Sequence, residues 1–381
     1  MKMPKFSFPL YVVKRPGMGF VKTWGIRVAA VLSAFLLAAL VSTIVKPGSF
    51  GTFIVGMFEG NFSDTSYIFT LLGCVSTYLL LSIAVAPVFK MKFWNIGGEG
   101  QATVGAIVTA VMLLKLPSTI PDGLAIVLSL ITAVAAGVVW ALIPTIFKIK
   151  FNTNETLFTL MMNYIATLAL SGFAIDLCSP TGSHTFPLIP EGRTIIEIGQ
   201  IQYLPFVVAA VVLTVVIFLY LKKTKHGFEL SVLGDSVNTA RYTGIKINKV
   251  IIRTMIISGA IAGLVGFLIV CGQSQTLTAA PIEGKGFTAV LIAWLGHFNP
   301  AEIALYSFFV GFFDKGTSYV ASLIQVSTDY FAGLIIGLFI LLVVSSEFFV
   351  RYQIKVRHKE VTVKPNDKKP IEKSKTKKEA K

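Results

Sequence analysis

Cysteine and histidine are scarce in this chain, and neither forms a recognisable metal site. Cys74, Cys178 and Cys271 are far apart, lie in or beside apolar segments and lack the spacing of metal ligands. We expect structural thiols and no disulfide. The four histidines include no pair at zinc spacing. The sequence therefore predicts neither a metal site nor a metal-dependent enzyme.

Charge is also sparse. Charged residues make up 14% of the 381 residues, whereas 54% are hydrophobic and the mean hydropathy is +0.75. This balance excludes an ordinary soluble globular protein and indicates an all-α polytopic membrane protein, because about 20 apolar residues span the hydrocarbon as a helix. The clear apolar windows are 25–46, 66–89, 98–115, 123–147, 156–177, 203–221, 250–271 and 329–350.

Two weaker windows, 286–298 and 300–323, bring the expected number of transmembrane helices to about ten. Their interruptions are Gly296, Asn299, Pro300, Asp314 and Lys315. This region is therefore expected to form two half-helices or two simple spans. It echoes a glycine-rich break near Gly97 in the earlier half, and paired breaks suggest an internal repeat with a site between the halves.

Basic residues gather on one side of the predicted spans. Residues 1–27 contain six basic and no acidic residues, and 222–249 contains six basic against two acidic. Because basic loops favour the cytoplasmic side, both termini are expected there. The expected parts are a basic N-terminal segment (1–24), a transmembrane domain (25–350) and a basic disordered tail (351–381). The net charge of +15 is concentrated at the two ends, where it suits anionic lipid and does not call for nucleic acid.

Residues 93–101 read Phe-Trp-Asn-Ile-Gly-Gly-Glu-Gly-Gln between two apolar segments. Glycines and a glutamate here indicate a helix that begins or breaks inside the bilayer, where free backbone N–H groups and a positive dipole end can hold a ligand. Asn95, Glu99 and Thr103 recur every four residues and so share one helical face.

A second polar stripe follows in the later window that starts at residue 156. Glu155, Thr159, Asn163 and Thr167 also recur every four residues. The two stripes are expected to face each other. They can line a shared cavity, or they can simply hydrogen-bond one helix to another. Glu155 is also close in sequence to basic residues at 148 and 150, which favours an interfacial position.

The loop 222–249 is the longest expected cytoplasmic excursion. Asp235 or Ser236 can cap a short helix that runs to Tyr242, with Gly244 as its stop. Arg and Tyr on such a short exposed helix are usual anchors at protein interfaces. The segment is therefore either a docking element for a soluble partner or an ordinary solvated turn.

The sequence contains no motif for ATP hydrolysis. Gly284, Lys285 and Gly286 lack both the preceding glycine and the following Ser or Thr of a phosphate-binding loop. No serine nucleophile elbow occurs either. We therefore expect no catalytic residue and no cofactor, and any energy for work must come from a partner or an ion gradient.

Four segments together resemble a known family. They are Asn95–Gln101, Asn154–Ile165, Gly227–Gly244 and Gly286–Pro300. In this order, over roughly residues 65–345, they look like the permease subunits of bacterial ABC importers for nucleosides and simple sugars, in the branched-chain amino acid and ribose permease superfamily. The resemblance implies a multi-pass protein of the bacterial cell membrane that is not itself an enzyme.

The family pattern also implies partners and site residues. Two permeases would form the pore, and the long N-terminal extension favours a pair of paralogues. A cytoplasmic ATPase subunit would drive it, and an extracytoplasmic binding lipoprotein would deliver substrate. The expected substrate-path residues are Asn95, Glu99, Gln101, Thr103, Thr159, Asn163 and Thr167, and the expected ATPase-coupling residues are Gly234, Asp235, Asn238, Ala240, Arg241, Tyr242 and Gly244. Family members often have Asn and Pro where this chain has Ser236 and Val237.

Two other functions remain open from the sequence. A secondary transporter or channel would work without an ATPase and would use Glu99, Asp314 and Lys315 as coupling charges. An enzyme acting on a lipid-linked substrate would need a catalytic cluster, and the sequence offers none.

Overall fold

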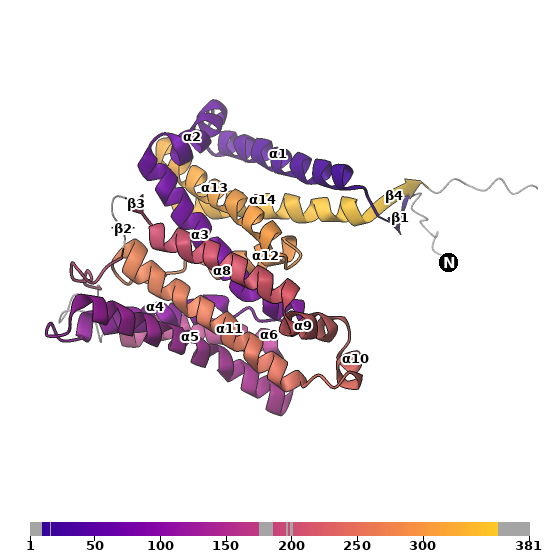
Figure 1. Cartoon of the computed structure of the whole chain (residues 1–381). Coiled ribbons are helices and arrows are strands. Elements are labelled where there is room, and N and C mark those ends of the chain that lie inside the picture. Colours follow the sequence, from indigo (N-terminus) through magenta and orange to yellow (C-terminus); the bar gives the residue numbers. More distant parts are fainter. Residues whose placement is uncertain (1–9, 16, 175–185, 196, 199–200, 357–381) are drawn as a thin grey trace, which may run out of the picture. The chain divides into compact units, whose positions relative to one another are not determined.

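Helices provide nearly all the regular structure of this chain (Figure 1). The computed structural model describes residues 10–15, 17–174, 186–195, 197–198 and 201–356. Cys178 therefore lies outside the described residues, as does most of the expected basic tail. The chain divides into two units, one formed by Met1–Val28 with Ser345–Lys381 and the other by Ala29–Val344. This division differs by a few residues from the one expected at 24/25 and 350/351.

The helices are, in chain order, α1 (Phe20–Val45), α2 (Phe50–Phe62), α3 (Thr65–Lys90), α4 (Gly98–Lys115), α5 (Asp122–Phe151), α6 (Glu155–Ala169), α8 (Leu204–Lys223), α9 (Lys225–Asp235), α10 (Val237–Tyr242), α11 (Ile247–Leu268), α12 (Lys285–Leu295), α13 (Pro300–Ile324) and α14 (Thr328–Arg351). Single π-helical segments, η1 (Leu170–Ala174) and η2 (Ile269–Ser274), extend α6 and α11. A two-residue strand pair, β2 (Glu197–Ile198) with β3 (Ile201–Gln202), precedes α8.

Each of the ten predicted windows coincides with a helix. Six described helical segments are long and apolar enough to cross a membrane: α1, α3, α5, α8, α11 with η2, and the part of α14 from Tyr330. The expectation of an all-α polytopic membrane protein is confirmed. The structure decides between the two alternatives left open for the later region: α13 is a single continuous helix that carries Asp314 and Lys315 near its middle, whereas α12 is short.

The first unit joins the two ends of the described chain. Strand β1 (Leu10–Lys14) pairs antiparallel with β4 (Tyr352–Val356), with Leu10 opposite Val356. Behind the strands, the guanidinium of Arg27 donates to the carboxylate of Glu347 at 2.8 and 2.9 Å, and both side chains are buried. Tyr352–Val356 was expected to begin a disordered tail, and this is corrected because its backbone is ordered by the ladder with β1.

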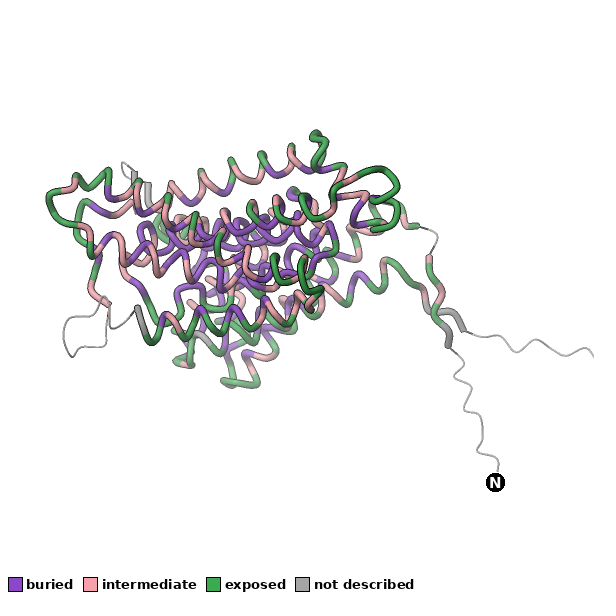
Figure 2. The backbone as a smooth tube through the Cα atoms, turned by 90° about the horizontal axis from the view of Figure 1, so that it is seen from below, coloured by how far each residue is buried: buried purple, intermediate pink, exposed green. Residues whose placement is uncertain are grey.

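Small residues bring the backbones of α4, α5 and α11 into direct contact. A methyl group at Gly105 in α4 would lie 2.6 Å from the carbonyl oxygen of Gly263 in α11, and one at Gly137 in α5 would lie 2.8 Å from Cα of Gly263. Gly259 and Gly263, four residues apart in α11, form the small-residue face that allows this approach. Figure 2 shows the buried residues concentrated in the interior of the bundle. The three helices form a rigid block of the second unit.

Candidate functional site

The glycine-rich turn folds back on itself before α4 begins. The side-chain carbonyl of Asn95, a fully buried residue, accepts a hydrogen bond from the backbone N–H of Gly97 at 2.9 Å. Gln101 donates to the same oxygen at 3.4 Å. Gly97 then serves as the N-cap position of α4, and a side chain there would meet Asn95 and Thr159. Glycine is therefore required for the tight approach of α6 at this turn.

The polar stripe of α6 lies against the backbone of the turn and the start of α4, whereas Glu99 of the other stripe is directed to α12, so stripe-to-stripe contact is not what joins the two helices. Oγ1 of Thr159 accepts from the N–H of Ile96 at 3.2 Å. The amide of Asn163 accepts from the N–H of Gly100 at 2.9 Å and donates to the carbonyl of Ile96 at 3.0 Å. These bonds satisfy backbone groups that a helix start leaves free, and so they favour the hydrogen-bonding interpretation for Thr159 and Asn163.

The other expected path residues, and Glu155, differ in burial. Gln101 and Thr103 are buried, and the hydroxyl of Thr103 donates to the carbonyl of Glu99 at 2.9 Å. Thr167 is exposed, although its hydroxyl donates to the carbonyl of Asn163 at 3.1 Å. Glu155 forms an ion pair with Lys148 at 2.8 Å, in agreement with its expected interfacial position.

Glu99 joins the glycine-rich turn to the start of α12. Its Oε1 accepts from the N–H of Gly284 at 2.9 Å, and its Oε2 accepts from the N–H of Gly286 at 2.7 Å. A methyl group at Gly286 would lie 2.7 Å from the backbone nitrogen of Glu99. The N-terminal ends of α4 and α12 therefore meet, and one carboxylate offsets the partial positive charge of both. The break near Gly97 therefore meets the start of α12, whereas the later break read from the sequence, at Gly296–Pro300, lies at the opposite end of that helix.

A cavity of about 890 Å³ lies beside the N-terminal end of α12. Its lining residues come from α3, from the segment before α12, and from α12, α13 and α14: Tyr78, Thr278, Ala279, Ala280, Glu283, Lys285, Thr288, Leu291, Asp314, Lys315, Ser318, Thr328, Ala332, Gly333, Ile336, Gly337 and Ile340. Tyr78 and Asp314 lie near the middle of their helices, so the cavity is at mid-depth of the predicted spans.

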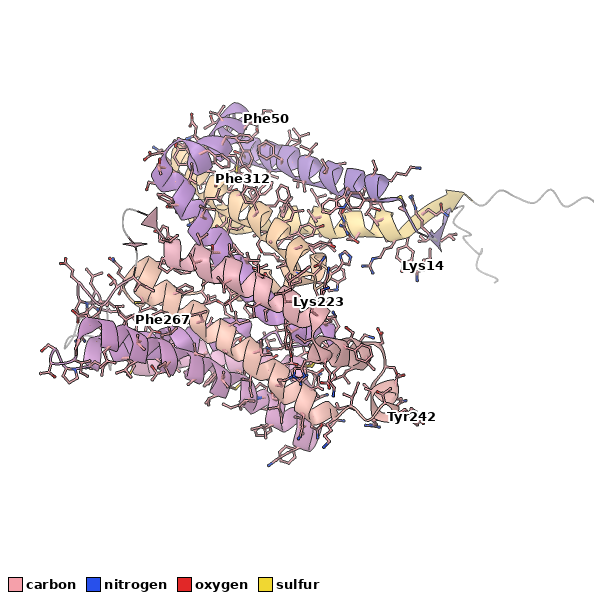
Figure 3. All side chains as sticks on the ribbon, viewed as in Figure 1. Lys14, Phe50, Lys223, Tyr242, Phe267 and Phe312 are labelled. Carbon is pink, nitrogen blue, oxygen red and sulfur yellow. The ribbon has the colours of Figure 1, made fainter. Side chains whose placement is uncertain are left out.

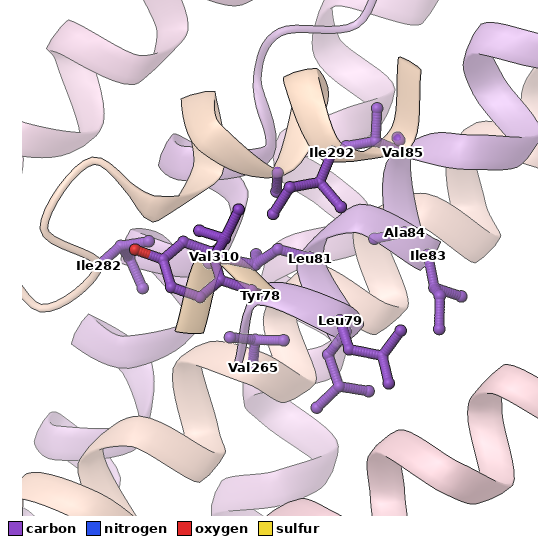
Figure 4. Close-up of a cluster of buried hydrophobic side chains, with 14 of the residues drawn as sticks. Tyr78, Leu79, Leu81, Ile83, Ala84, Val85, Val265, Ile282, Ile292 and Val310 are labelled. Carbon is purple, nitrogen blue, oxygen red and sulfur yellow. The ribbon is translucent and has the colours of Figure 1, made fainter. Parts of the chain in front are cut away.

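The carboxylate of Asp314, which lines this cavity, accepts two hydrogen bonds on one of its oxygens. The hydroxyl of Tyr78 donates to Oδ2 of Asp314 at 3.1 Å, and the thiol of Cys74 donates to the same oxygen at 3.2 Å. Figure 4 shows Tyr78 among buried apolar side chains, with its hydroxyl directed towards the segment that carries Ile282. Lys285 forms an ion pair with Glu283.

The sequence interpretation missed Tyr78 and Lys285 as cavity residues. Lys285 was considered only as part of an incomplete phosphate-loop motif, although a lysine beside a predicted span was itself a signal. Asp314 and Lys315 are also charges within a predicted span, but the sequence suggested a role for them only in the ion-coupled alternative. None of the seven expected path residues lines this cavity, but Glu99 fixes the helix end that forms one wall.

The expected coupling loop forms a helical hairpin of α9 and α10. Ser236 caps α10, accepting from the N–H of Thr239 at 3.3 Å, whereas Asp235 is the last residue of α9. Gly244, with a φ of +76°, follows the helix as its stop. Figure 3 shows Tyr242 at the outer tip of this hairpin, and its side chain is 92% exposed.

The coupling residues fall into two groups by burial. Asp235, Asn238 and Arg241 are exposed, as are Tyr242 and Gly244. Ala240 is fully buried. Gly234 lies against the C-terminal end of α3, where a methyl group would clash with the carbonyl oxygen of Lys90. The two small residues therefore hold the hairpin against the bundle, and the exposed residues form its outer surface.

An ion pair connects the hairpin to α11. Arg253 donates to Oε2 of Glu229 in α9 at 3.0 Å, and it also contacts the ring of His226. Burial tends to raise the pKa of Glu229, but the hydrogen bonds from Arg253 and His226 outweigh it and hold this pKa below its ordinary value. Glu229 is therefore ionised at neutral pH, and the hairpin is attached to α11 by charge.

These features define a class: a polytopic α-helical membrane protein with a mid-depth polar cavity and an exposed helical hairpin at one end of the bundle. The chain belongs to the family described as the permease component of branched-chain amino acid transport systems, whose sequence profile matches residues 67–344. It is therefore a membrane component of a transport system.

Curated relatives agree with this membership. The guanosine ABC transporter permease protein NupP of Bacillus subtilis is 29% identical over 282 residues, which cover 72% of this chain and 80% of the relative. A glucose ABC transporter permease protein of Haloferax volcanii is 28% identical over 353 residues, or 87% and 90% of the two chains. A second guanosine permease of Bacillus subtilis, NupQ, is 26% identical over 264 residues, or 66% and 81%. No solved structure gives a significant match.

Proposed function

We propose that this chain is a permease subunit of an ATP-driven importer and forms part of the path for nucleosides or simple sugars such as ribose. A separate cytoplasmic subunit hydrolyses ATP, a second and paralogous permease completes the pore, and an extracytoplasmic lipoprotein delivers substrate. The similarity to permeases named for guanosine and glucose supports the substrate range. The occurrence of two similar permeases in one organism supports the pairing.

The observation that carries this proposal is the exposed surface of the α9–α10 hairpin. Asn238, Arg241 and Tyr242 project from a short helix whose other face is anchored by Ala240. An exposed Arg and Tyr on a rigid base suit docking into a groove of a soluble partner. We therefore assign contact with the ATPase to Asp235, Asn238, Arg241 and Tyr242, and positioning of the hairpin to Gly234, Ala240 and Gly244.

The substrate path runs, in this proposal, through the cavity beside α12. Glu99 acts at its edge by fixing the N-terminal end of α12. The other six expected path residues act indirectly, by building the turn and the α4–α6 contact that hold Glu99 in place: Asn95, Gln101, Thr103, Thr159, Asn163 and Thr167. Alternating access then requires only that α12 and its neighbours exchange between two arrangements.

The proposed orientation places both termini and the hairpin in the cytoplasm of a bacterial cell. The basic ends of α3 and α8 lie at the same end of the bundle as α9, because Gly234 of α9 lies against Lys90 and α8 leads directly into α9. The basic end of α5 lies towards the start of α11, which follows α10, because α5 and α11 contact each other in antiparallel order. Basic residues on this side follow the usual rule for cytoplasmic loops. The two chain ends would contact anionic lipid.

One observation favours the ion-coupled alternative. Asp314 and Lys315 line a cavity at mid-depth of the membrane, where charges often couple ions to transport. Such a transporter would continue to work without ATP and would stop when the proton or sodium gradient collapses.

The test is uptake of labelled guanosine, uridine and ribose in cells that express the complete transporter, with and without this chain, before and after ATP depletion and after addition of an ionophore. Uptake that requires this chain and ATP is expected. In the same cells, Arg241→Glu should reduce uptake at least tenfold without changing the amount of this chain in the membrane. Charge reversal at a docking anchor costs roughly 2 kcal/mol or more of binding free energy.

Lys150→Glu is the matched control, because Lys150 is exposed at the same basic end but lies on α5. It should leave uptake unchanged. Normal uptake by Arg241→Glu would reject the docking assignment. Uptake that ignores ATP and follows the ion gradient would reject the importer and support the alternative.

A further inference from the structure

The charged groups of the cavity balance each other. Glu283 and Asp314 supply two carboxylates, and Lys285 and Lys315 supply two ammonium groups. A cavity without net charge gives no Coulombic advantage to an anion or a cation. It does offer strong hydrogen-bonding groups to a neutral polar ligand, and this is the first indication of what the cavity holds.

One carboxylate and one ammonium of this set remain available to a ligand. Lys285 and Glu283 already neutralise each other. Asp314 accepts hydrogen bonds from Tyr78 and Cys74 on Oδ2 only, so among the described residues its Oδ1 has no donor. Lys315 likewise forms no hydrogen bond or ion pair with the described part of the chain. A hydroxyl group both donates and accepts, and so can bridge a carboxylate oxygen and an ammonium.

The part of the wall that α14 forms is apolar. Along α14 the cavity is lined by Ala332, Gly333, Ile336, Gly337 and Ile340. A methyl group at Gly333 or Gly337 would have no atom within 4 Å, so the two glycines leave a flat apolar surface open towards the cavity. Such a surface suits the face of a planar ring, because apolar contact is non-directional and scales with area.

We propose that the cavity binds a nucleoside, with the vicinal hydroxyls of its ribose between Asp314 and Lys315 and its base against the glycine face of α14. This assignment rests on the proposed import function and names the substrate class within it. The volume of about 890 Å³ accommodates such a ligand together with water. Tyr78 and Cys74 are positioning residues, because they orient the carboxylate of Asp314 and do not themselves bind the ribose hydroxyls.

The test compares uptake of guanosine, 2′-deoxyguanosine and ribose by the complete transporter carrying either the wild-type chain or Asp314→Asn. The binding protein is the same in both, so a change in ratio reports the permease. A site that hydrogen-bonds a hydroxyl discriminates strongly against an analogue that lacks it. Asp314→Asn should lower guanosine uptake about tenfold and 2′-deoxyguanosine uptake much less, which brings their ratio towards one.

Two further variants keep the test valid if Asp314→Asn fails to reach the membrane. Tyr78→Phe removes one donor to Oδ2 and should shift the same ratio in the same direction. Gly337→Leu projects into open space and should block guanosine more than ribose. Its matched control is Gly123→Leu, which also enters open space but lies at the start of α5, away from the cavity.

The outcomes separate this inference from the import function. A wild-type chain without ATP-dependent uptake of any of the three substrates would reject the import function itself. ATP-dependent uptake with an unchanged guanosine ratio in Asp314→Asn and Tyr78→Phe would reject only the ribose site. Equal loss of guanosine and ribose in Gly337→Leu would reject the base site and indicate a cavity for simple sugars.

Discussion

At the residue scale, Glu99 illustrates how a charge can be retained in a membrane protein without touching substrate. Its two carboxylate oxygens accept from two backbone N–H groups at the start of α12, at 2.9 and 2.7 Å. Those N–H groups have no partner within their own helix, and the dipole of α12 adds a favourable field. One side chain from the earlier half of the chain thus completes a helix of the later half.

Glu99→Gln should slow transport of every substrate to a similar degree. Glutamine keeps one acceptor oxygen and loses the charge, so one N–H of α12 is left without a good partner, at a cost of about 1–2 kcal/mol. If this free energy is lost from the arrangement of α12 that transport requires, uptake of guanosine and of ribose should each decrease about 5- to 30-fold. Parallel initial-rate measurements of the two substrates give the readout.

The control is Glu59→Gln, because Glu59 in α2 is exposed. It should leave both rates unchanged. A loss confined to one substrate in Glu99→Gln would mean that the carboxylate contacts substrate directly, and unchanged rates for both would mean that the cap is dispensable.

At the scale of elements, the length of each apolar run predicted the spans well, because such a run consists of consecutive residues and can be read directly from the sequence. It missed α2, whose glycines at 51, 56 and 60 and single charge at Glu59 leave no long apolar window. It also left α13 undecided, because Asp314 and Lys315 interrupt the apolar pattern. The structure explains why the helix continues: both residues face a polar cavity, so neither charge is exposed to hydrocarbon.

The site was less predictable than the spans. Spacing of four correctly placed Thr159 and Asn163 on one face of α6, since this follows from helix geometry, whereas Glu99 is directed to α12 and not to α6. Nothing in the spacing shows that the side-chain amide of Asn163 would form its hydrogen bonds with the backbone of Gly100 and Ile96. The cavity brings together residues more than 200 positions apart, such as Tyr78 and Asp314, and only tertiary packing determines that proximity.

The α5–α11 contact should not tolerate even one added carbon. In Gly263→Ala the new methyl group would clash with the carbonyl oxygen of Ala133, so the helices must separate. Overpacking of this kind should lower the free energy of unfolding by about 1–3 kcal/mol. Thermal unfolding of the purified protein in detergent measures the loss as a lower midpoint.

Gly123→Ala on α5 is the comparison for this variant, because its methyl group would meet no atom within 4 Å. It should leave the midpoint unchanged or raise it slightly, since alanine favours a helix over glycine. Equal midpoints for both variants would mean that α5 and α11 are not in close contact.

At the scale of the second unit, a continuous route of rigid contacts leads from the hairpin to the cavity. The ion pair of Glu229 with Arg253 connects α9 to α11. The glycines of α11 hold it against α4 and α5, and Glu99 at the start of α4 holds α12. A displacement of the hairpin would therefore reach the wall that carries Lys285 without crossing a flexible segment.

A charge exchange tests this route. Glu229→Arg and Arg253→Glu should each reduce ATP-driven uptake at least tenfold, because each replaces the attraction between α9 and α11 by two like charges that face each other. The double variant should recover most of the uptake. Failure of the double variant to recover, with normal membrane levels, would show that the pair does not transmit motion.

The same pair predicts how the route responds to acid. The folded pKa of Glu229 lies below its ordinary value. Its contribution to stability is therefore present above the pKa of the unfolded chain and is lost only as the pH falls through the lower folded value. Mild acidification alone should leave the hairpin attached.

The β1–β4 ladder constrains how the whole chain threads the bilayer. Leu10 pairs with Val356 and Lys14 with Tyr352, so the two strands must lie on the same side of the membrane. A path that leaves one side and returns to it crosses an even number of times. The helices other than α12 that coincide with predicted spans are α1, α3, α4, α5, α6, α8, α11, α13 and α14, which is nine. If all nine of these helices cross, an odd count cannot bring the ends together, and the short α12 with the segment before it would then have to supply a tenth crossing.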